Sequence, residues 1–229
     1  MKEFFWGVSQ SAFQFEMGDI FHRNIDTRSD WWTWVRDPIN LKTGLVSGDL
    51  PEEGINNYEL YPLDHSLAKG LGLNAYSLSV EWSRIFPCPT YGGVEVEYET
   101  DGNGLIKAIK ITKDHLEELD RIANRKEVEH YREVLLNLKK LGGFKVFLTL
   151  IHYSLPVWLH DPVESRERNL ENENNGWVNQ RAVLELAKFA AYMAYRFGDL
   201  IDMWATFNEP AVMVELGYLA PYSGFPPQV

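Results

Sequence analysis

The segment Lys145–Tyr153 reads KVFLTLIHY, a nearly continuous apolar run that closes on a histidine and a tyrosine. Runs of this kind are typical of strands buried on both faces of a parallel sheet. Three further short runs have strand character, at Phe5–Ser9, Asn74–Trp82 and Asp202–Asn208. Helical patterns separate the runs, so the chain alternates strand and helix, which predicts an α/β fold with right-handed parallel crossovers.

Apolar residues at helical spacing predict the helices that connect these strands. Such spacing runs through Tyr131–Leu141 and Val183–Phe197, and glycine follows both segments. A third helix precedes the second strand. We place its start at Pro62, because proline is tolerated in a first turn, and its end near Gly70 or Gly72.

Bulky and small or charged side chains alternate along the second strand segment, Asn74–Trp82. A period of two is the signature of a strand with two different faces. The pattern suits a barrel wall with its bulky face outward and its polar face inward. The bulky face carries Tyr76, Leu78, Val80 and Trp82, and the polar face carries Ser77, Ser79, Glu81 and Ser83.

The number of strand-helix units is half of what a closed barrel requires. At most four units are present, and we expect no helix after Pro210, whereas a (β/α)8 barrel has eight. Residues 1–229 are therefore predicted to form the N-terminal half of one barrel domain. An insertion at about 89–126 interrupts the pattern. Its segments Val94–Tyr98 and Ile106–Ile111 alternate around an Asp-Gly-Asn-Gly turn, which predicts a surface hairpin.

Charge and aromatic content narrow the class of ligand. The formal net charge of −11, from 33 acidic and 22 basic residues, argues against nucleic acid or an anionic membrane as the main partner. Neutral ligands stay open. The 8 tryptophans and 11 tyrosines offer flat apolar faces that suit sugar rings, and they also suit ordinary core packing.

The single cysteine, Cys88, cannot form an internal disulfide, so a reducing compartment is expected. The N-terminal residues lack a basic segment followed by a long apolar stretch, and no later run approaches the ~20 apolar residues of a membrane span. We expect a cytoplasmic protein. We expect no cofactor, and we expect no metal because no pair among the histidines has ligand spacing. The histidines are His22, His65, His115, His130, His152 and His160.

Polar side chains follow several of the strand segments. Thr206–Pro210 reads TFNEP, so Asn208 and Glu209 stand where the fourth apolar run breaks at a proline. Proline cannot continue a parallel ladder, so these two residues lie at the mouth of a strand. In a barrel, side chains from several strands converge at that end. The residues close to the ends of earlier runs are Gln14, Arg84 and His152.

Five motifs, in order along the whole chain, resemble glycoside hydrolase family 1 and specifically its archaeal β-glycosidase and β-mannosidase branch. This resemblance implies a (β/α)8 barrel and a retaining exo-β-glycosidase that releases terminal β-linked glucose, galactose or mannose. The motifs are WGVSQSAFQFEMG at 6–18, GLVSGDLPE at 44–52, VEWSRIFP at 80–87, LPVWLHDP at 155–162 and TFNEP at 206–210.

The resemblance assigns roles to five residues. Glu209 matches the acid/base, one of two carboxyl groups that lie ~5 Å apart in retaining glycosidases. As an acid it must be protonated, which requires desolvation and a neighbouring carboxylate. Asn208 matches the residue that hydrogen-bonds the 2-hydroxyl of the sugar. Gln14 and His152 match residues that hold the 3- and 4-hydroxyls, and Tyr153 stands where many relatives carry a tryptophan or phenylalanine platform.

Two departures from the family pattern bear on activity. The family nucleophile is a glutamate in a threonine-glutamate-asparagine-glycine motif on the seventh strand, beyond these 229 residues. Ser77 stands where relatives carry an arginine that contacts the nucleophile. Arg84 is a different position, for which a structural role is expected. The isolated chain is therefore predicted to be inactive.

Two interpretations of function stay open at this point. One is the acid/base half of a glycosidase, and the other is a truncated, inactive fragment that binds sugar or a protein partner. The expected ligand is a β-glycoside or oligosaccharide. Because the first and fourth strands would each have an unpaired edge, we also expect self-association or pairing with a complementary half-barrel.

Overall fold

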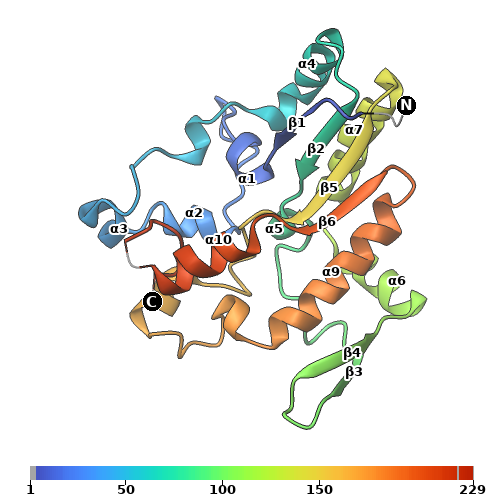
Figure 1. The fold of residues 1–229 in the computed structure, drawn as a ribbon. Coiled ribbons are helices and arrows are strands. Elements are labelled where there is room, and N and C mark those ends of the chain that lie inside the picture. Colours follow the sequence, from blue (N-terminus) through green and yellow to red (C-terminus); the bar gives the residue numbers. More distant parts are fainter. Residues whose placement is uncertain (1–3, 221, 229) are drawn as a thin grey trace.

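The computed structural model describes residues 4–220 and 222–228. These residues contain one four-stranded, all-parallel sheet in the order β1-β2-β5-β6 (Figure 1). The parallel α/β architecture expected from the sequence is confirmed. The strands are β1 (Gly7–Gln10), β2 (Ala75–Ser79), β5 (Lys145–Ile151) and β6 (Met203–Phe207).

The register brings the ends of the strands together along one edge of the sheet. Ser79 lies opposite Thr149, and Ile151 lies opposite Phe207. The carboxyl ends of parallel strands meet at one edge, so the residues that follow β1, β5 and β6 share it.

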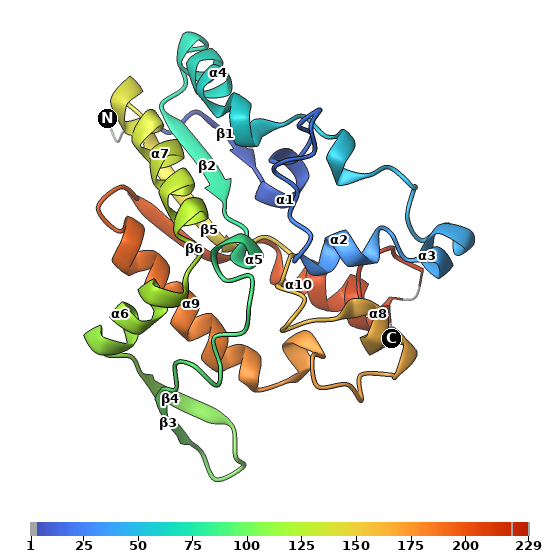
Figure 2. The same ribbon diagram turned by 180° about the vertical axis from the view of Figure 1, so that it is seen from behind.

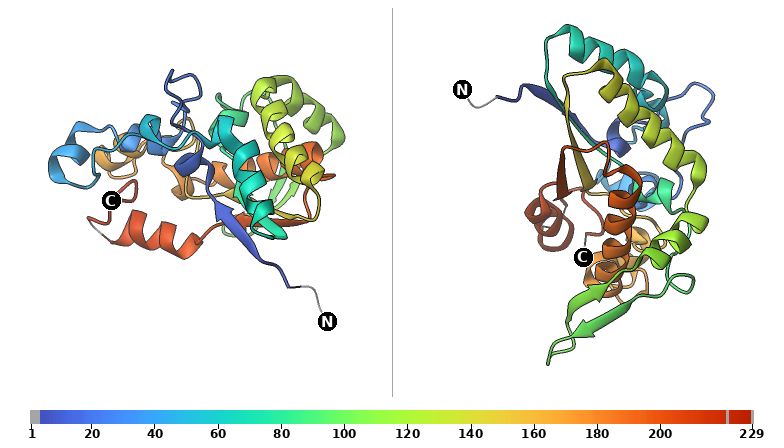
Figure 3. Two further views of the ribbon diagram at one scale, coloured as in Figure 1. Left: turned by 90° about the horizontal axis from the view of Figure 1, so that it is seen from above. Right: turned by 90° about the vertical axis from the view of Figure 1, so that its right-hand side faces the viewer.

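Three long helices form the crossovers and cover one side of the sheet (Figure 3). Their buried apolar residues pack with alternate residues of β2 and β5 in one core, which includes Tyr76, Leu78, Val146 and Leu148. The bulky face of β2 therefore points toward the helices, as the alternation predicted. The helices are α4 (Asn57–Gly70), α7 (Arg125–Leu141) and α9 (Arg181–Phe197).

Helix α4 begins five residues earlier than we predicted, and Pro62 lies inside it. Proline lacks the N–H that would bond to the carbonyl of Tyr58, so local propensity alone disfavours this extension. Tertiary packing outweighs that cost. Tyr58 is buried, its ring stacks on His130 of α7 at a centroid distance of 3.6 Å, and its hydroxyl donates to Glu127.

Strand β2 ends at Ser79, three residues earlier than predicted. The N–H of Glu81 donates to the Tyr131 hydroxyl of α7, at 3.0 Å, instead of continuing a strand ladder. Trp82 then begins a short helix, α5 (Trp82–Ile85). Only Ser77 and Ser79 of the predicted polar face therefore belong to the strand itself.

The insertion contains the expected hairpin, β3 (Glu97–Thr100) with β4 (Ile106–Lys110), and it projects from the body (Figure 2). Asp101 closes the turn, because its carboxylate accepts from the N–H groups of Asn103 and Leu105. The insertion also holds a helix that the sequence analysis did not identify, α6 (Lys113–Ile122), capped by Thr112 and His115.

The remaining short elements lie in loops. The expectation that no helix follows β6 was wrong, because α10 and η3 come directly after Glu209. Within the described residues, no helix is long and apolar enough to cross a membrane. The short elements are α1 (Ala12–Phe15), α2 (Asp30–Trp34), α3 (Pro38–Thr43), η1 (Pro51–Glu53), α8 (Pro162–Glu167), η2 (Gly176–Val178), α10 (Pro210–Val214) and η3 (Glu215–Leu219).

The two outer strands are exposed, in contrast to β2 and β5. Val8 of β1 is 42% exposed, and Met203 and Trp204 of β6 are each 39% exposed. Among the described residues, each outer strand has a neighbouring strand on one side only. Apolar edge strands of this kind are templates for pairing with another segment.

Candidate active site

The predicted site residues come from three places at the carboxyl edge of the sheet. Gln14 lies in α1, just after β1, and His152 and Tyr153 directly follow β5. Asn208 and Glu209 directly follow β6. The strand-end placement inferred from the sequence is therefore present for each of these segments.

Gln14, His152 and Tyr153 line one pocket, with a volume of about 640 Å3. Asn208 and Glu209 lie outside its lining. Glu209 joins the group through Tyr153, whose hydroxyl donates a short hydrogen bond to Oε2 of Glu209. The pocket is also lined by Ser11, Phe13, Trp31, Val35, Ser47, Asp49, Leu50, Pro51, Glu53, Gly54 and Phe225.

Tyr153 and Glu209 share an uncommon backbone conformation. Their φ angles are 72° and 43°, in the left-handed region that non-glycine residues avoid. Such a conformation costs about 1–3 kcal/mol per residue and tends to occur at functional sites. Both residues lie two positions after the end of a strand, Tyr153 after β5 and Glu209 after β6.

The phenol of Tyr153 is electrostatically coupled to Glu209. Burial, together with the hydrogen bond and the negative charge of Glu209, raises the pKa of Tyr153 to about 12. The hydroxyl therefore stays protonated at neutral pH and acts as a donor to the carboxylate.

Glu209 itself is exposed. The acid role predicted a desolvated carboxyl group, and the described residues do not supply that desolvation. The physical reason is topological, since Glu209 follows an outer strand that has its one neighbour on the side of β5.

The two remaining pocket residues differ in their surroundings. His152 is half-buried, and burial lowers its pKa although the charge of Glu209 opposes this effect, so the neutral imidazole is favoured. Gln14 is exposed, and its Oε1 accepts from the Ser11 hydroxyl at 2.8 Å. That bond uses the oxygen as an acceptor and leaves the amide NH2 of Gln14 able to donate elsewhere.

An aromatic wall completes the pocket, and of its members residue-level sequence reasoning found only Tyr153. Trp31 and Phe225 meet edge to face with centroids 5.1 Å apart, and Tyr153 meets Phe225 at the same distance. Phe13 lies 6.4 Å from Trp31. For Phe13, Trp31 and Phe225 the only sequence signal was the total aromatic content, because folding brings residues 13, 31, 153 and 225 together.

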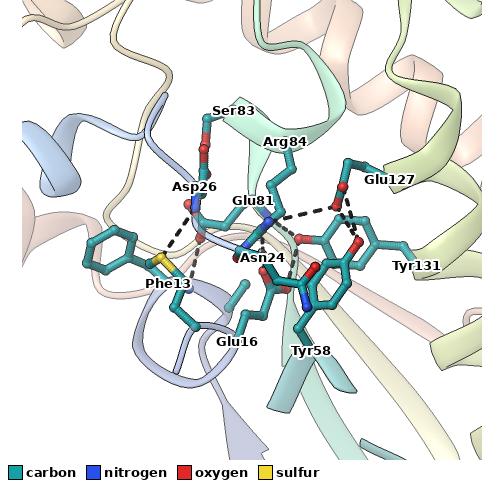
Figure 4. Close-up of polar contacts among 12 residues, drawn as sticks. Phe13, Glu16, Asn24, Asp26, Tyr58, Glu81, Ser83, Arg84, Glu127 and Tyr131 are labelled. Atoms are coloured by element: carbon teal, nitrogen blue, oxygen red, sulfur yellow. Dashed lines mark hydrogen bonds and ion pairs between the residues drawn. The ribbon is translucent and has the colours of Figure 1, made fainter. Parts of the chain in front are cut away.

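A buried ionic cluster surrounds Arg84 (Figure 4). Nε of Arg84 lies 2.6 Å from Oε2 of Glu16, and the guanidinium also donates to the carbonyl of Asn24 at 2.8 Å. Arg84 is 6% exposed, as expected for a structural residue. The buried carboxyl groups of the cluster belong to Glu16, Asp26, Glu81 and Glu127.

Burial shapes the protonation of this cluster. It raises the pKa of Glu16, partly offset by Arg84. It also raises the pKa of Glu81 well above its ordinary value, with further increases from the charges of Asp26 and Glu16. Arg84 is therefore the cation around which carboxyl groups are packed, and Glu81 favours its neutral form.

Ser77 lies in the middle of β2, opposite Ser9 and Phe147. It places no positive charge on the strand where the family pattern has arginine. Among the described residues, no group of three or more His, Cys, Asp or Glu side chains is arranged to hold a metal ion.

Comparison with known proteins gives the family of this chain, with its polar strand-end residues on a parallel α/β sheet. The chain belongs to glycosyl hydrolase family 1, whose family model matches residues 1–100 and 120–229. The resemblance derived from the sequence motifs is confirmed. The unmatched residues include β4 and most of α6.

Individual relatives agree with this assignment. The chain is 64% identical to a β-galactosidase of Pyrococcus woesei over 229 residues, which is all of this chain and 44% of the relative. Its structure is similar to that of a β-glycosidase from Thermosphaera aggregans, with a TM-score of 0.95 and 45% identity, covering 100% of this chain and 47% of the other. The structure is also similar to that of a β-glucosidase from Pyrococcus furiosus, with a TM-score of 0.93 and 43% identity. That match covers 100% of this chain and 47% of the other. The chain thus spans about half the length of these relatives.

Proposed function

We propose that this chain carries the acid/base half of a retaining exo-β-glycosidase that releases terminal β-linked glucose, galactose or mannose. The family and the names of its relatives support a β-glycosidase. The observation that carries the proposal is the contact of Glu209 with Tyr153, on the wall of a pocket that also contains Gln14 and His152.

Each residue has a chemical task in this proposal. Glu209 donates a proton to the leaving glycosidic oxygen and later takes one from the attacking water. Asn208 hydrogen-bonds the 2-hydroxyl, a contact that strengthens in the transition state. Gln14 and His152 hold the 3- and 4-hydroxyls, and the aromatic wall around Tyr153 packs on the ring.

These 229 residues taken alone lack the second carboxylate that the reaction requires, so we propose that they do not turn over substrate by themselves. The four parallel strands correspond to the first four βα units of a (β/α)8 barrel. The exposed apolar edges of β1 and β6 support pairing with a complementary half-barrel or self-association. Such a partner would also cover Glu209 and supply its desolvation.

Complementation tests this proposal. Residues 1–229 are mixed with the part of the Pyrococcus woesei β-galactosidase that this chain does not match, and aryl β-glycoside hydrolysis is measured. We expect activity in the mixture, and Glu209→Gln should lower it by about 100-fold or more, the usual contribution of general acid catalysis. Glu215→Gln, an exposed glutamate six residues later, is the matched control and should be close to unchanged. Full activity in the Glu209→Gln mixture would overturn the assignment.

A second candidate is an inactive fragment that binds sugar or a protein partner. Ser77 favours it, because an arginine there would keep the nucleophile ionised. If the glycosidase proposal holds, Ser77→Arg raises the rate of the complemented enzyme. If mixtures stay inactive while the isolated chain binds monosaccharides, and Gln14→Ala abolishes that binding, the binding fragment is the better description.

A further inference from the structure

The short helix α1, which carries Gln14, is anchored by residues of another strand. Its N-cap, Ser11, makes no side-chain capping bond. Its first backbone N–H groups instead donate to the segment at the end of β2: Ala12 to the Ser79 hydroxyl at 2.8 Å, and Phe13 to Oε1 of Glu81 at 3.1 Å. Both acceptors lie 67 or 68 residues further along the chain.

The same oxygen of Glu81 also holds the turn after β5. The hydroxyl of Ser154 donates to Oε1 of Glu81 at 2.9 Å. Ser154 directly follows Tyr153, and Phe13 directly precedes Gln14. One carboxyl oxygen therefore connects the two loops that carry the predicted sugar-binding residues after β1 and β5.

Glu81 is buried, and its backbone is hydrogen-bonded to α7. It is 1% exposed, and its own N–H donates to the hydroxyl of Tyr131 at 3.0 Å. Tyr131 in turn donates to Glu16 at 2.8 Å, and Glu16 is paired with Arg84 (Figure 4). A buried group whose backbone is hydrogen-bonded to a long helix is suited to setting the positions of others.

We propose that Glu81 is a positioning residue, which fixes the separation between Gln14 and the His152–Tyr153 turn and thereby the spacing of the contacts to the sugar hydroxyls. It touches no substrate. The consequence for sugar binding rests on the proposed function, whereas the connection between the two loops does not.

The chemistry of the site indicates what the side chain at position 81 must supply. Both loops donate to Oε1, and Oε2 has no hydrogen-bond partner among the described residues. One fixed acceptor oxygen is therefore sufficient, and a negative charge is not required. Burial also favours the neutral acid. Glutamine has the same shape and keeps that oxygen, whereas methionine keeps the volume and removes it.

Hydrogen exchange on residues 1–229 tests the connection without any ligand. In Glu81→Met, the Phe13 amide should exchange about tenfold faster relative to the core amide of Val146, as expected for a lost buried hydrogen bond. Glu81→Gln should stay within about threefold of the unchanged protein. The matched control is Glu127→Met, a second buried carboxyl group of the cluster that contacts Tyr58 instead of the loops. Glu127→Met should leave the ratio of the Phe13 exchange rate to the Val146 exchange rate unchanged.

Sugar affinity supplies the second readout. Glu81→Met and Ser154→Ala should both weaken binding of galactose or glucose, and Glu81→Gln should retain it. Unchanged Phe13 exchange in Glu81→Met, or equal acceleration in Glu127→Met, overturns the proposal. If Glu81→Met does not fold, loss of the Phe13 protection in Glu81→Gln, or unchanged affinity in Ser154→Ala, overturns it instead. If neither the unchanged protein nor its complemented mixture binds sugar, the proposed function fails while the exchange ratio still decides the role of Glu81.

Discussion

Two polar regions lie at the same ends of the strands and differ in how completely their groups are paired. The ionic cluster around Arg84 of α5 is buried, and its other members come from the residue after α1, from α7 and from the loop before α2. The candidate sugar pocket is open, and its acid, Glu209, follows the exposed outer strand β6. Residues of this chain surround the ionic cluster, whereas the surroundings of the pocket depend on what covers the outer edge of β6.

The difference shows which part of the site can be stable in these residues alone. Glu81 and Arg84 follow β2, the strand that has neighbours on both sides, and both are buried, so their surroundings are fixed by packing. Glu209 follows a strand with one described neighbour. A scaffold that positions Gln14, His152 and Tyr153 can therefore exist before the catalytic group has the environment that its chemistry requires.

The largest expected effect concerns Arg84, the cation of the buried ionic cluster. Arg84→Met leaves the carboxylate of Glu16 buried without its ion pair, and breaking such a pair costs about 3–5 kcal/mol. Gln14→Met in the open pocket should change the free energy of unfolding by less than about 0.5 kcal/mol, as exposed substitutions do. Denaturant titration of both variants measures the contrast. Equal losses of unfolding free energy in the two variants would show that the ionic cluster and the open pocket contribute alike to stability.

The next effect concerns the stability of the protein at acid pH and depends on His130, which stacks on Tyr58. Burial, and then the charges of Arg84 and Lys126, lower the pKa of His130 to about 4, from an ordinary 6.5. The unfolded state then binds the proton first, so stability is complete above pH 6.5 and is lost as the pH falls toward 4. His130→Gln should remove about 3 kcal/mol of this dependence. Denaturation at several pH values compares the two proteins, and parallel curves would contradict the burial of this ring.

A smaller effect concerns the pKa of Tyr153 in the open pocket. Because the charge of Glu209 contributes to the raised pKa of Tyr153, Glu209→Gln should lower that pKa from about 12 by about one unit. Spectroscopic titration of the phenol measures it, and Tyr153→Phe identifies the signal. An unchanged titration would show that the two side chains do not meet in solution.

The smallest expected effect lies at the opposite ends of the strands. Burial would raise the pKa of Asp202, but hydrogen bonds from Lys139, the Val146 N–H and Lys145 outweigh it and lower the pKa to about 2. The stabilisation is present above the ordinary value of 3.8 and is lost as the pH falls toward 2. Asp202→Asn should cost about 1 kcal/mol at neutral pH, after allowance for solvent screening. A similar loss at pH 2 would contradict the ionic origin of the effect.

Sequence patterns identified the elements whose own residues specify them. The run at 145–151, the helix ending at Leu141 and the hairpin around Asp101 were found because periodicity and turn residues are local signals. The start of α4 and the end of β2 were misplaced. Both depend on side chains of α7, which pack on Tyr58 and bond to Glu81 from about 50–70 positions away.

The sequence by itself determined the alternating strand-helix order, the family, and the segments that supply Gln14, His152, Tyr153, Asn208 and Glu209. Those properties are carried by motifs and by local spacing. Only the tertiary structure decided that Trp31 and Phe225 form a wall of the pocket, that Glu81 connects two loops, and that Glu209 is exposed. These depend on contacts between residues far apart in the chain and on which strand lies at the edge of the sheet, neither of which a local pattern records.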